Sequence, residues 1–265
     1  MLTDSHAHLN DERLMPQAAE IVARLGEYGV GRVVCASYDA KSSVDAAALA
    51  DKYREVFATV AFHPHESKSY TDGDAKLFCR LAKNKKVLAI GETGLDYYYD
   101  LSERSVQRRV FAEHIELADA LGLPVVVHIR DAYEDAIAIL TANRAKLNNG
   151  VLIHNFSGSV ETMRALDELG CYYSFGGTIT FKNNKKGAEA LLAADKSKIL
   201  LETDCPYLTP EPHRGKLNFP YYVKHVAERC AEILDIDFDA LCALTEKNVE
   251  SLFKRLNGGA GAANG

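Results

Sequence analysis

Short apolar runs alternate with amphipathic helical patterns along almost the whole chain. Eight such runs can be counted, and each is followed by a segment with apolar residues at helical spacing. The runs expected to be strands lie at the start of the chain and over residues 32–36, 56–62, 87–91, 125–128, 151–154, 171–175 and 199–204. Short, nearly all-apolar strands are typical of a parallel sheet that is buried on both faces. The pattern predicts an α/β protein with a TIM-like (β/α)8 barrel. A doubly wound open sheet is the alternative, but it would place its ligand at a single switch point.

The composition does not change abruptly between residues 1 and 256, so we expect a single domain there. A chain of 265 residues, 47% of them hydrophobic, is long enough to bury one large core. Residues 257–265 contain only Gly, Ala and Asn, and we expect this tail to be disordered.

The charge of the chain excludes a protein coated in positive charge. The formal net charge is −6 and the pI is about 5.9, so any contact with nucleic acid must be local and weakened by salt. The six cysteines form no C-x-x-C pair, which favours buried, reduced thiols. No leader-like segment and no apolar stretch of about 18 residues is seen, so we expect a cytoplasmic protein without a membrane span.

Ionisable residues follow the apolar runs at the point where each run ends. They are His6, His8, His63, Glu92, His128, His154 and Asp204. The carboxyl ends of barrel strands converge on one axis, where barrel active sites lie. In an extended strand residues i and i+2 point to the same side, so His6 and His8 can approach one metal ion. A lone histidine after a strand is more often structural, but seven coincidences together indicate a metal centre.

The number of candidate ligands indicates two ions. Four histidines and two carboxylates exceed the three protein ligands that a single tetrahedral catalytic ion requires. We expect His6, His8 and Asp204 at one ion and His128 and His154 at the other, with Glu92 bridging the two. Imidazole ligands favour Zn²⁺, Mn²⁺ or Fe²⁺ over Mg²⁺.

Three residues are candidates for direct catalytic roles. Besides bridging, Glu92 lies beside the expected reaction centre, and Asp204 is placed to act as general base toward the attacking water. For His63, two roles stay open: contact with substrate or leaving group, and support of a metal ligand.

Basic residues lie just past several strand ends and are candidates for phosphate binding. They are Arg130, Lys182, Arg214 and Lys216. Exposed loops commonly carry such residues without a binding role. The run Tyr97 to Tyr99 could stack on bases or pack as a hydrophobic lid.

The order of several motifs carries a family resemblance from the first strand to about Leu256. The motifs are residues 4–9 (DSHAHL), 62–65 (FHPH), 91–97 (GETGLDY), 124–132 (PVVVHIRDA), 154–158 (HNFSG), 173–177 (YSFGG), 201–208 (LETDCPYL) and 212–218 (PHRGKLN). On these residues the sequence resembles the TatD family of metal-dependent deoxyribonucleases, within the wider amidohydrolase-like group. Two positions depart from the expected family pattern: Phe219 replaces an acidic residue, and His114 replaces a glutamine.

The resemblance implies a divalent-metal-dependent deoxyribonuclease, with Mg²⁺ as cofactor. It also implies a 3′-to-5′ exonuclease acting on single-stranded DNA or on ends, without an obligate protein partner. One rival reading is a metal-dependent hydrolase of a small ester, lactone or amide, because the same site chemistry serves acyl and phosphoryl centres. A second rival is a binding protein that keeps metals only for structure.

Overall fold

The computed structural model describes residues 1–259, and within them eight parallel strands form one sheet in chain order. The strands are β1 (Leu2–Ala7), β2 (Val30–Cys35), β3 (Val56–Val60), β4 (Val87–Asp96), β5 (Val125–Arg130), β6 (Val151–Ile153), β7 (Tyr172–Phe175) and β8 (Ile199–Leu201). The chain after β8 is hydrogen bonded to β1: the Asp204 N–H donates to the His6 carbonyl at 2.9 Å. The strands therefore close into a barrel, and the predicted TIM-like fold is confirmed.

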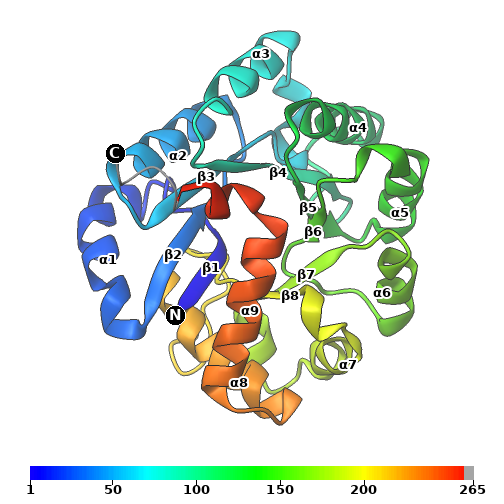
Figure 1. Cartoon of the computed structure of the whole chain (residues 1–265). Helices are drawn as coiled ribbons and strands as arrows, with labels where there is room; N and C mark the ends of the chain where they lie inside the picture. The colour runs from blue at the N-terminus through cyan, green and yellow to red at the C-terminus, as the bar shows by residue number, and fades with distance from the viewer. Residues whose placement is uncertain (260–265) are drawn as a thin grey trace.

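Helices surround the barrel, as Figure 1 shows. They are α1 (Ala18–Arg24), α2 (Ala40–Lys52), α3 (Asp72–Leu81), α4 (Arg104–Leu121), α5 (Tyr133–Ala142), α6 (Val160–Asp167), α7 (Lys185–Ala193), α8 (Val223–Leu234) and α9 (Phe238–Leu252). Capping fixes where several begin; the Asp39 carboxylate accepts the Ser42 N–H at 2.7 Å and starts α2. Within residues 1–259, no helix combines the length and apolar character that a membrane span requires.

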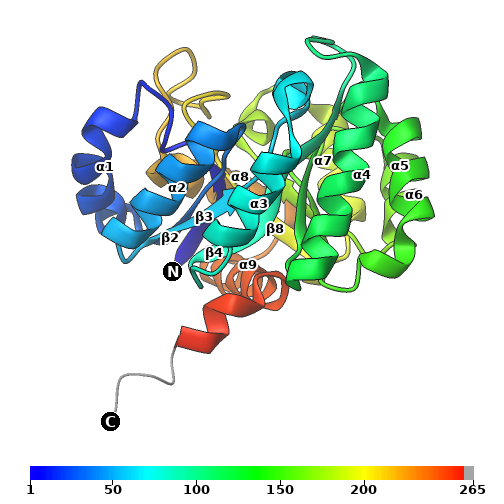
Figure 2. The same cartoon turned by 90° about the horizontal axis from the view of Figure 1, so that it is seen from above.

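The amino end of the barrel is filled with apolar side chains and covered by α9. The residues that pack together there are Val34, Leu88, Ala89, Val126, Leu152, Leu200, Val249, Leu252 and Phe253. Figure 2 shows α9 on the side of the N-terminus, with the loop after β8 on the opposite side. Since this packing seals one end, only the carboxyl end is open to a ligand.

Three expectations about boundaries need correction or fall partly outside the structure. The expected helix over residues 11–28 is divided into two 3-10 turns and the short helix α1, because Pro16 and Gly26 interrupt the helical pattern. The fourth strand continues past Glu92 to Asp96. A 3-10 helix, Lys254–Gly259, covers the start of the expected disordered tail, and residues 260–265 lie outside the described part of the chain.

Candidate metal centre

The Glu92 carboxylate lies at the middle of the carboxyl end of the barrel and has a different set of neighbours at each oxygen. Near Oε2 lie His6 Nε2 at 3.1 Å and His8 Nε2 at 3.5 Å. Asp204 Oδ1 completes this set, at 3.3 Å from His8 Nε2 and 3.9 Å from His6 Nε2. We call His6, His8 and Asp204 the Oε2 cluster.

The other oxygen of Glu92 has three histidines around it. His154 Nε2 lies 2.8 Å from Oε1, His128 Nδ1 lies at 2.9 Å and His63 Nε2 at 3.4 Å. We call His63, His128 and His154 the Oε1 cluster. All seven residues predicted from the strand ends therefore meet around one carboxylate.

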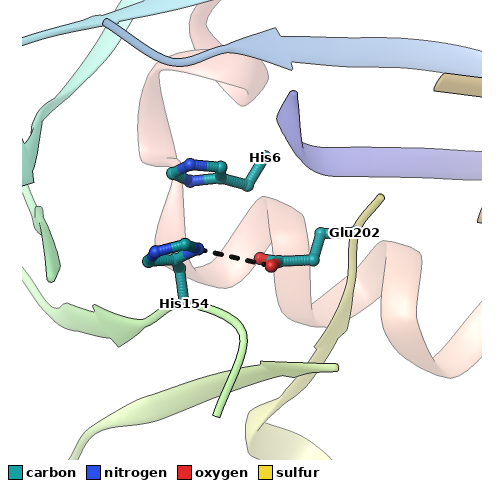
Figure 3. A group of neighbouring side chains, drawn as sticks. All are labelled: His6, His154 and Glu202. Atoms are coloured by element: carbon teal, nitrogen blue, oxygen red, sulfur yellow. Dashed lines mark hydrogen bonds and ion pairs between the residues drawn. The ribbon is translucent and has the colours of Figure 1, made fainter. Parts of the chain in front are cut away.

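The donor atoms fit divalent cations. The ligand atoms of His6, His8 and Glu92 lie within 4.8 Å of one another, as do those of His63, Glu92 and His128. A third such group, His6, His154 and Glu202, lies deeper, with the His6 and His154 rings stacked at 4.0 Å between centroids. Figure 3 shows this stack and the contact between His154 and Glu202. Nitrogen donors beside a carboxylate with two exposed edges are the chemistry of a two-ion hydrolytic site.

Charge inside the centre is held by mutual contact, because its members are buried. Glu92 is only 3% exposed. Burial raises the pKa of its carboxyl, but the surrounding histidines, His154 first, outweigh burial and hold the pKa well below its ordinary value. Burial also opposes protonation of His154, yet Glu92 and Glu202 hold the pKa of this ring well above the usual range. A divalent cation can replace the protons that now balance these carboxylates.

Hydrogen bonds on the far side of each ring decide which nitrogen faces Glu92. His8 Nδ1 lies 3.2 Å from the Ala36 carbonyl, which can only accept, so Nε2 is left free. At His63, by contrast, Nδ1 accepts the His65 N–H at 3.1 Å, so Nε2 carries the proton of the neutral ring.

The two departures from the family pattern have different surroundings. His114 is fully buried; its Nδ1 donates to the Val110 carbonyl at 2.8 Å and its Nε2 accepts the Phe62 N–H at 3.1 Å. It thereby anchors the backbone immediately before His63. Phe219 stacks on Tyr221 with ring centroids 5.2 Å apart, which makes this position part of an aromatic surface cluster.

A cleft of about 1360 Å³ opens over the centre. Of the four predicted phosphate-binding residues, Arg130 lines it, and its guanidinium lies over the rings of Tyr98 and Tyr99 at 4.0 and 4.8 Å. Among the described residues, the cleft lining does not include Lys182, Arg214 or Lys216. Arg214 lies behind the cleft wall, 4.2 Å from the ring centre of Phe181.

The cleft also contains residues that sequence reasoning missed. Arg13 lies over the Tyr207 ring at 4.6 Å and is held by two hydrogen bonds of 2.8 Å to Asp11, and Lys41 pairs with Asp45 at 2.7 Å. Nothing in the local sequence distinguishes these residues from ordinary loop and helix positions. Asp96 and Glu202, which contact histidines of the Oε1 cluster, were missed although both lie inside quoted motifs.

A family model described as TatD related DNase matches residues 3–254. The chain belongs to this family. It is 39% identical over 254 residues to YabD of Bacillus subtilis, covering 96% of this chain and 99% of that one. It is 35% identical over 256 residues to YcfH of Escherichia coli, covering 95% of each chain. Both relatives are described as uncharacterized metal-dependent hydrolases.

Solved structures show the same fold. A TatD homologue of Escherichia coli, YJJV, is similar with a TM-score of 0.90 and 25% identity, covering 96% of this chain and 98% of that chain. A PTE-like lactonase of Deinococcus radiodurans is similar with a TM-score of 0.66 and 12% identity, covering 95% of each chain. This second likeness concerns the fold alone.

Proposed function

We propose that this TatD family protein hydrolyses DNA phosphodiester bonds with two divalent metal ions, as a 3′-to-5′ exonuclease acting on single strands or ends. Membership of the family makes it a metal-dependent hydrolase; the DNA substrate and the polarity are what the proposal adds. The observation that carries the proposal is the Glu92 carboxylate, whose two oxygens face two separate donor clusters. The cysteines are all unpaired, which supports a cytoplasmic location.

Each cluster supplies the residues that would hold one ion. His6, His8 and Asp204 would hold an ion at Oε2 of Glu92, and His128 and His154 would hold an ion at Oε1. When bound, the ions lower the pKa of the attacking water and neutralise charge on the phosphate. The imidazole-rich ligands suit Zn²⁺ or Mn²⁺, whereas the family resemblance favours Mg²⁺.

His63 has the properties of a hydrogen-bond donor to the substrate. Its Nε2 faces Glu92 Oε1 and carries the proton of the neutral ring, because Nδ1 accepts the His65 N–H. Burial lowers the pKa of His63 to about 4, so the ring is neutral at pH 7 and Nε2 has no lone pair for a metal. We therefore assign His63 to a phosphate oxygen or to the leaving oxygen.

Asp204 has the properties of the general base. Its Oδ1 lies within 3.9 Å of both histidines of the Oε2 cluster. Hydrogen bonding by His8 outweighs burial and holds the pKa of Asp204 below its ordinary value. Asp204 also lines the cleft, so its carboxylate can accept a proton from water attacking a substrate held there.

Substrate recognition in the proposal depends on Arg130 and the tyrosines under it. The Arg130 guanidinium can bind a phosphate next to the Oε1 cluster, while exposed Tyr99 offers a face to a base. The centre lies at the base of a cleft inside a barrel end, which suits a strand end or single strand better than an intact duplex.

The proposal is tested with single-stranded oligonucleotides labelled at the 3′ or the 5′ end. Wild type, Glu92→Ala and Asp204→Ala are stripped of metal and assayed after addition of Mg²⁺, Mn²⁺ or Zn²⁺. His225→Ala, which changes a surface histidine on α8, is the control. We expect stepwise loss of the 3′ end by wild type and by the control, and none by the two site variants. Cleavage by all four proteins would reveal a contaminant, and turnover of a lactone or ester without DNA cleavage would establish the rival hydrolase.

A further inference from the structure

Asp96, at the end of β4, accepts four hydrogen bonds with its two oxygens. Its Oδ2 lies 2.9 Å from His65 Nε2 and 3.2 Å from His128 Nε2. Its Oδ1 accepts the backbone N–H groups of Tyr98 at 3.0 Å and Tyr99 at 2.9 Å. The side chain is fully buried, so water cannot replace any of these partners.

The two backbone contacts fix the role of each Asp96 oxygen. A peptide N–H can only donate, so the atom facing Tyr98 and Tyr99 must be an acceptor. The other atom, in the carboxylate, is then also an acceptor, and the His128 nitrogen facing it must carry a proton. A neutral imidazole has one protonated nitrogen, so the His128 lone pair is left on Nδ1, the atom 2.9 Å from Glu92 Oε1.

We propose that Asp96 is a positioning residue that selects the tautomer in which His128 can bind a metal. The proposal rests on the metal-holding role of His128 given under the proposed function. Asp96 also joins this ligand to the turn of Tyr98 and Tyr99, on which Arg130 lies. The same carboxylate therefore aligns a metal ligand and the aromatic support of the expected phosphate contact.

Glu202 provides a matched comparison on the neighbouring ligand. Its Oε1 accepts from His154 Nδ1 at 3.3 Å, as Figure 3 shows, and its Oε2 accepts the Ser174 hydroxyl. A hydroxyl can donate or accept, unlike a peptide N–H. A glutamine at position 202 can therefore keep its carbonyl toward His154 and direct its amide toward Ser174.

An asparagine at position 96 has no such freedom. Its carbonyl must stay toward the Tyr98 and Tyr99 N–H groups, so its amide N–H faces His128 Nε2. To accept this hydrogen bond, the ring must move its proton to Nδ1, and the nitrogen facing Glu92 loses its lone pair. The change preserves size and polarity but inverts the tautomer.

The experiment compares Asp96→Asn, Glu202→Gln and His128→Ala by zinc affinity, using competition with a chelator and metal content per chain. Circular dichroism confirms folding. We expect Asp96→Asn to lose about 10- to 100-fold in affinity for one of the two ions, as His128→Ala does, and Glu202→Gln to stay within a few-fold of wild type. Wild-type affinity in Asp96→Asn would overturn the inference. Wild-type affinity in His128→Ala would overturn the ligand assignment on which it rests.

A second measurement needs no variant. In the zinc-loaded wild type, ¹⁵N NMR of labelled histidine is expected to show His128 protonated at Nε2 and bound to metal through Nδ1. A ring bound through Nε2 would contradict the role of Asp96, whatever the variants do. A purely structural contribution of Asp96 would not change which nitrogen carries the proton in Asp96→Asn, so the same spectrum of that variant separates the two roles.

Discussion

The two sides of Glu92 achieve the same ring orientation by different means. On the Oε2 side, His6 and His8 come from one short segment of chain, and His8 is held by a backbone carbonyl. On the Oε1 side, the three histidines follow different strands, and His128 and His154 are held by the buried carboxylates of Asp96 and Glu202. One cluster is fixed by local backbone, whereas the other depends on side chains distant in sequence.

The largest expected difference between the two sides is seen when one ligand is removed from each. His8→Ala and His154→Ala should each lose one ion per chain and about 10³-fold in kcat, which is about 4 kcal/mol. Only His154→Ala leaves a buried carboxylate, Glu202, without its charged partner. We expect it also to lose about 3 kcal/mol in free energy of unfolding.

Metal analysis, kinetics and urea denaturation of metal-free protein measure these effects, with His225→Ala as control. Equal stability of the two ligand variants would show that the carboxylates on the Oε1 side are not structural partners of their histidines.

A smaller effect concerns His114, which anchors the backbone before His63 on the Oε1 side. Burial lowers its pKa from 6.5 to about 4, so between these values the unfolded chain binds a proton that the folded chain does not. The free energy of unfolding should therefore fall as the pH falls from 7 to 4, with a contribution of roughly 3 kcal/mol from this ring.

The contribution is obtained by comparing wild type with His114→Gln, because glutamine can accept the Phe62 N–H and donate to the Val110 carbonyl without titrating. Denaturant unfolding at several pH values should show a shallower decline in the variant. Parallel curves would mean that His114 is protonated in the folded chain or is replaced by water.

The smallest expected effect separates the basic residues. Arg130→Ala should raise KM for an oligonucleotide about tenfold, because it removes a charged contact beside the Oε1 cluster. Lys216→Ala, outside the cleft lining, should change KM by no more than about twofold. Steady-state kinetics at two salt concentrations measures both. A larger effect of Lys216 would place the substrate along the loop after β8.

The sequence predicted the residues of the centre because a parallel barrel imposes a simple rule. Strand ends meet at one rim, so His63, His128 and His154 could be grouped although many residues separate them. The same rule failed for Lys182, Arg214 and Lys216, since loop residues past the strand ends have no fixed direction. It also overlooked Asp96, which appears in the sequence as the end of a motif rather than as a partner of His128.

What the sequence alone determined is therefore the barrel, its polar rim and the types of donor atom, because apolar periodicity and strand-end chemistry are properties of local segments. What only the tertiary structure decided is which oxygen of Glu92 each histidine faces, which ring nitrogen is free and which cations line the cleft. These depend on hydrogen bonds between atoms far apart in the chain, such as those joining His128 to Asp96 and His154 to Glu202. Such contacts are set by the packing of whole elements, and no local pattern encodes them.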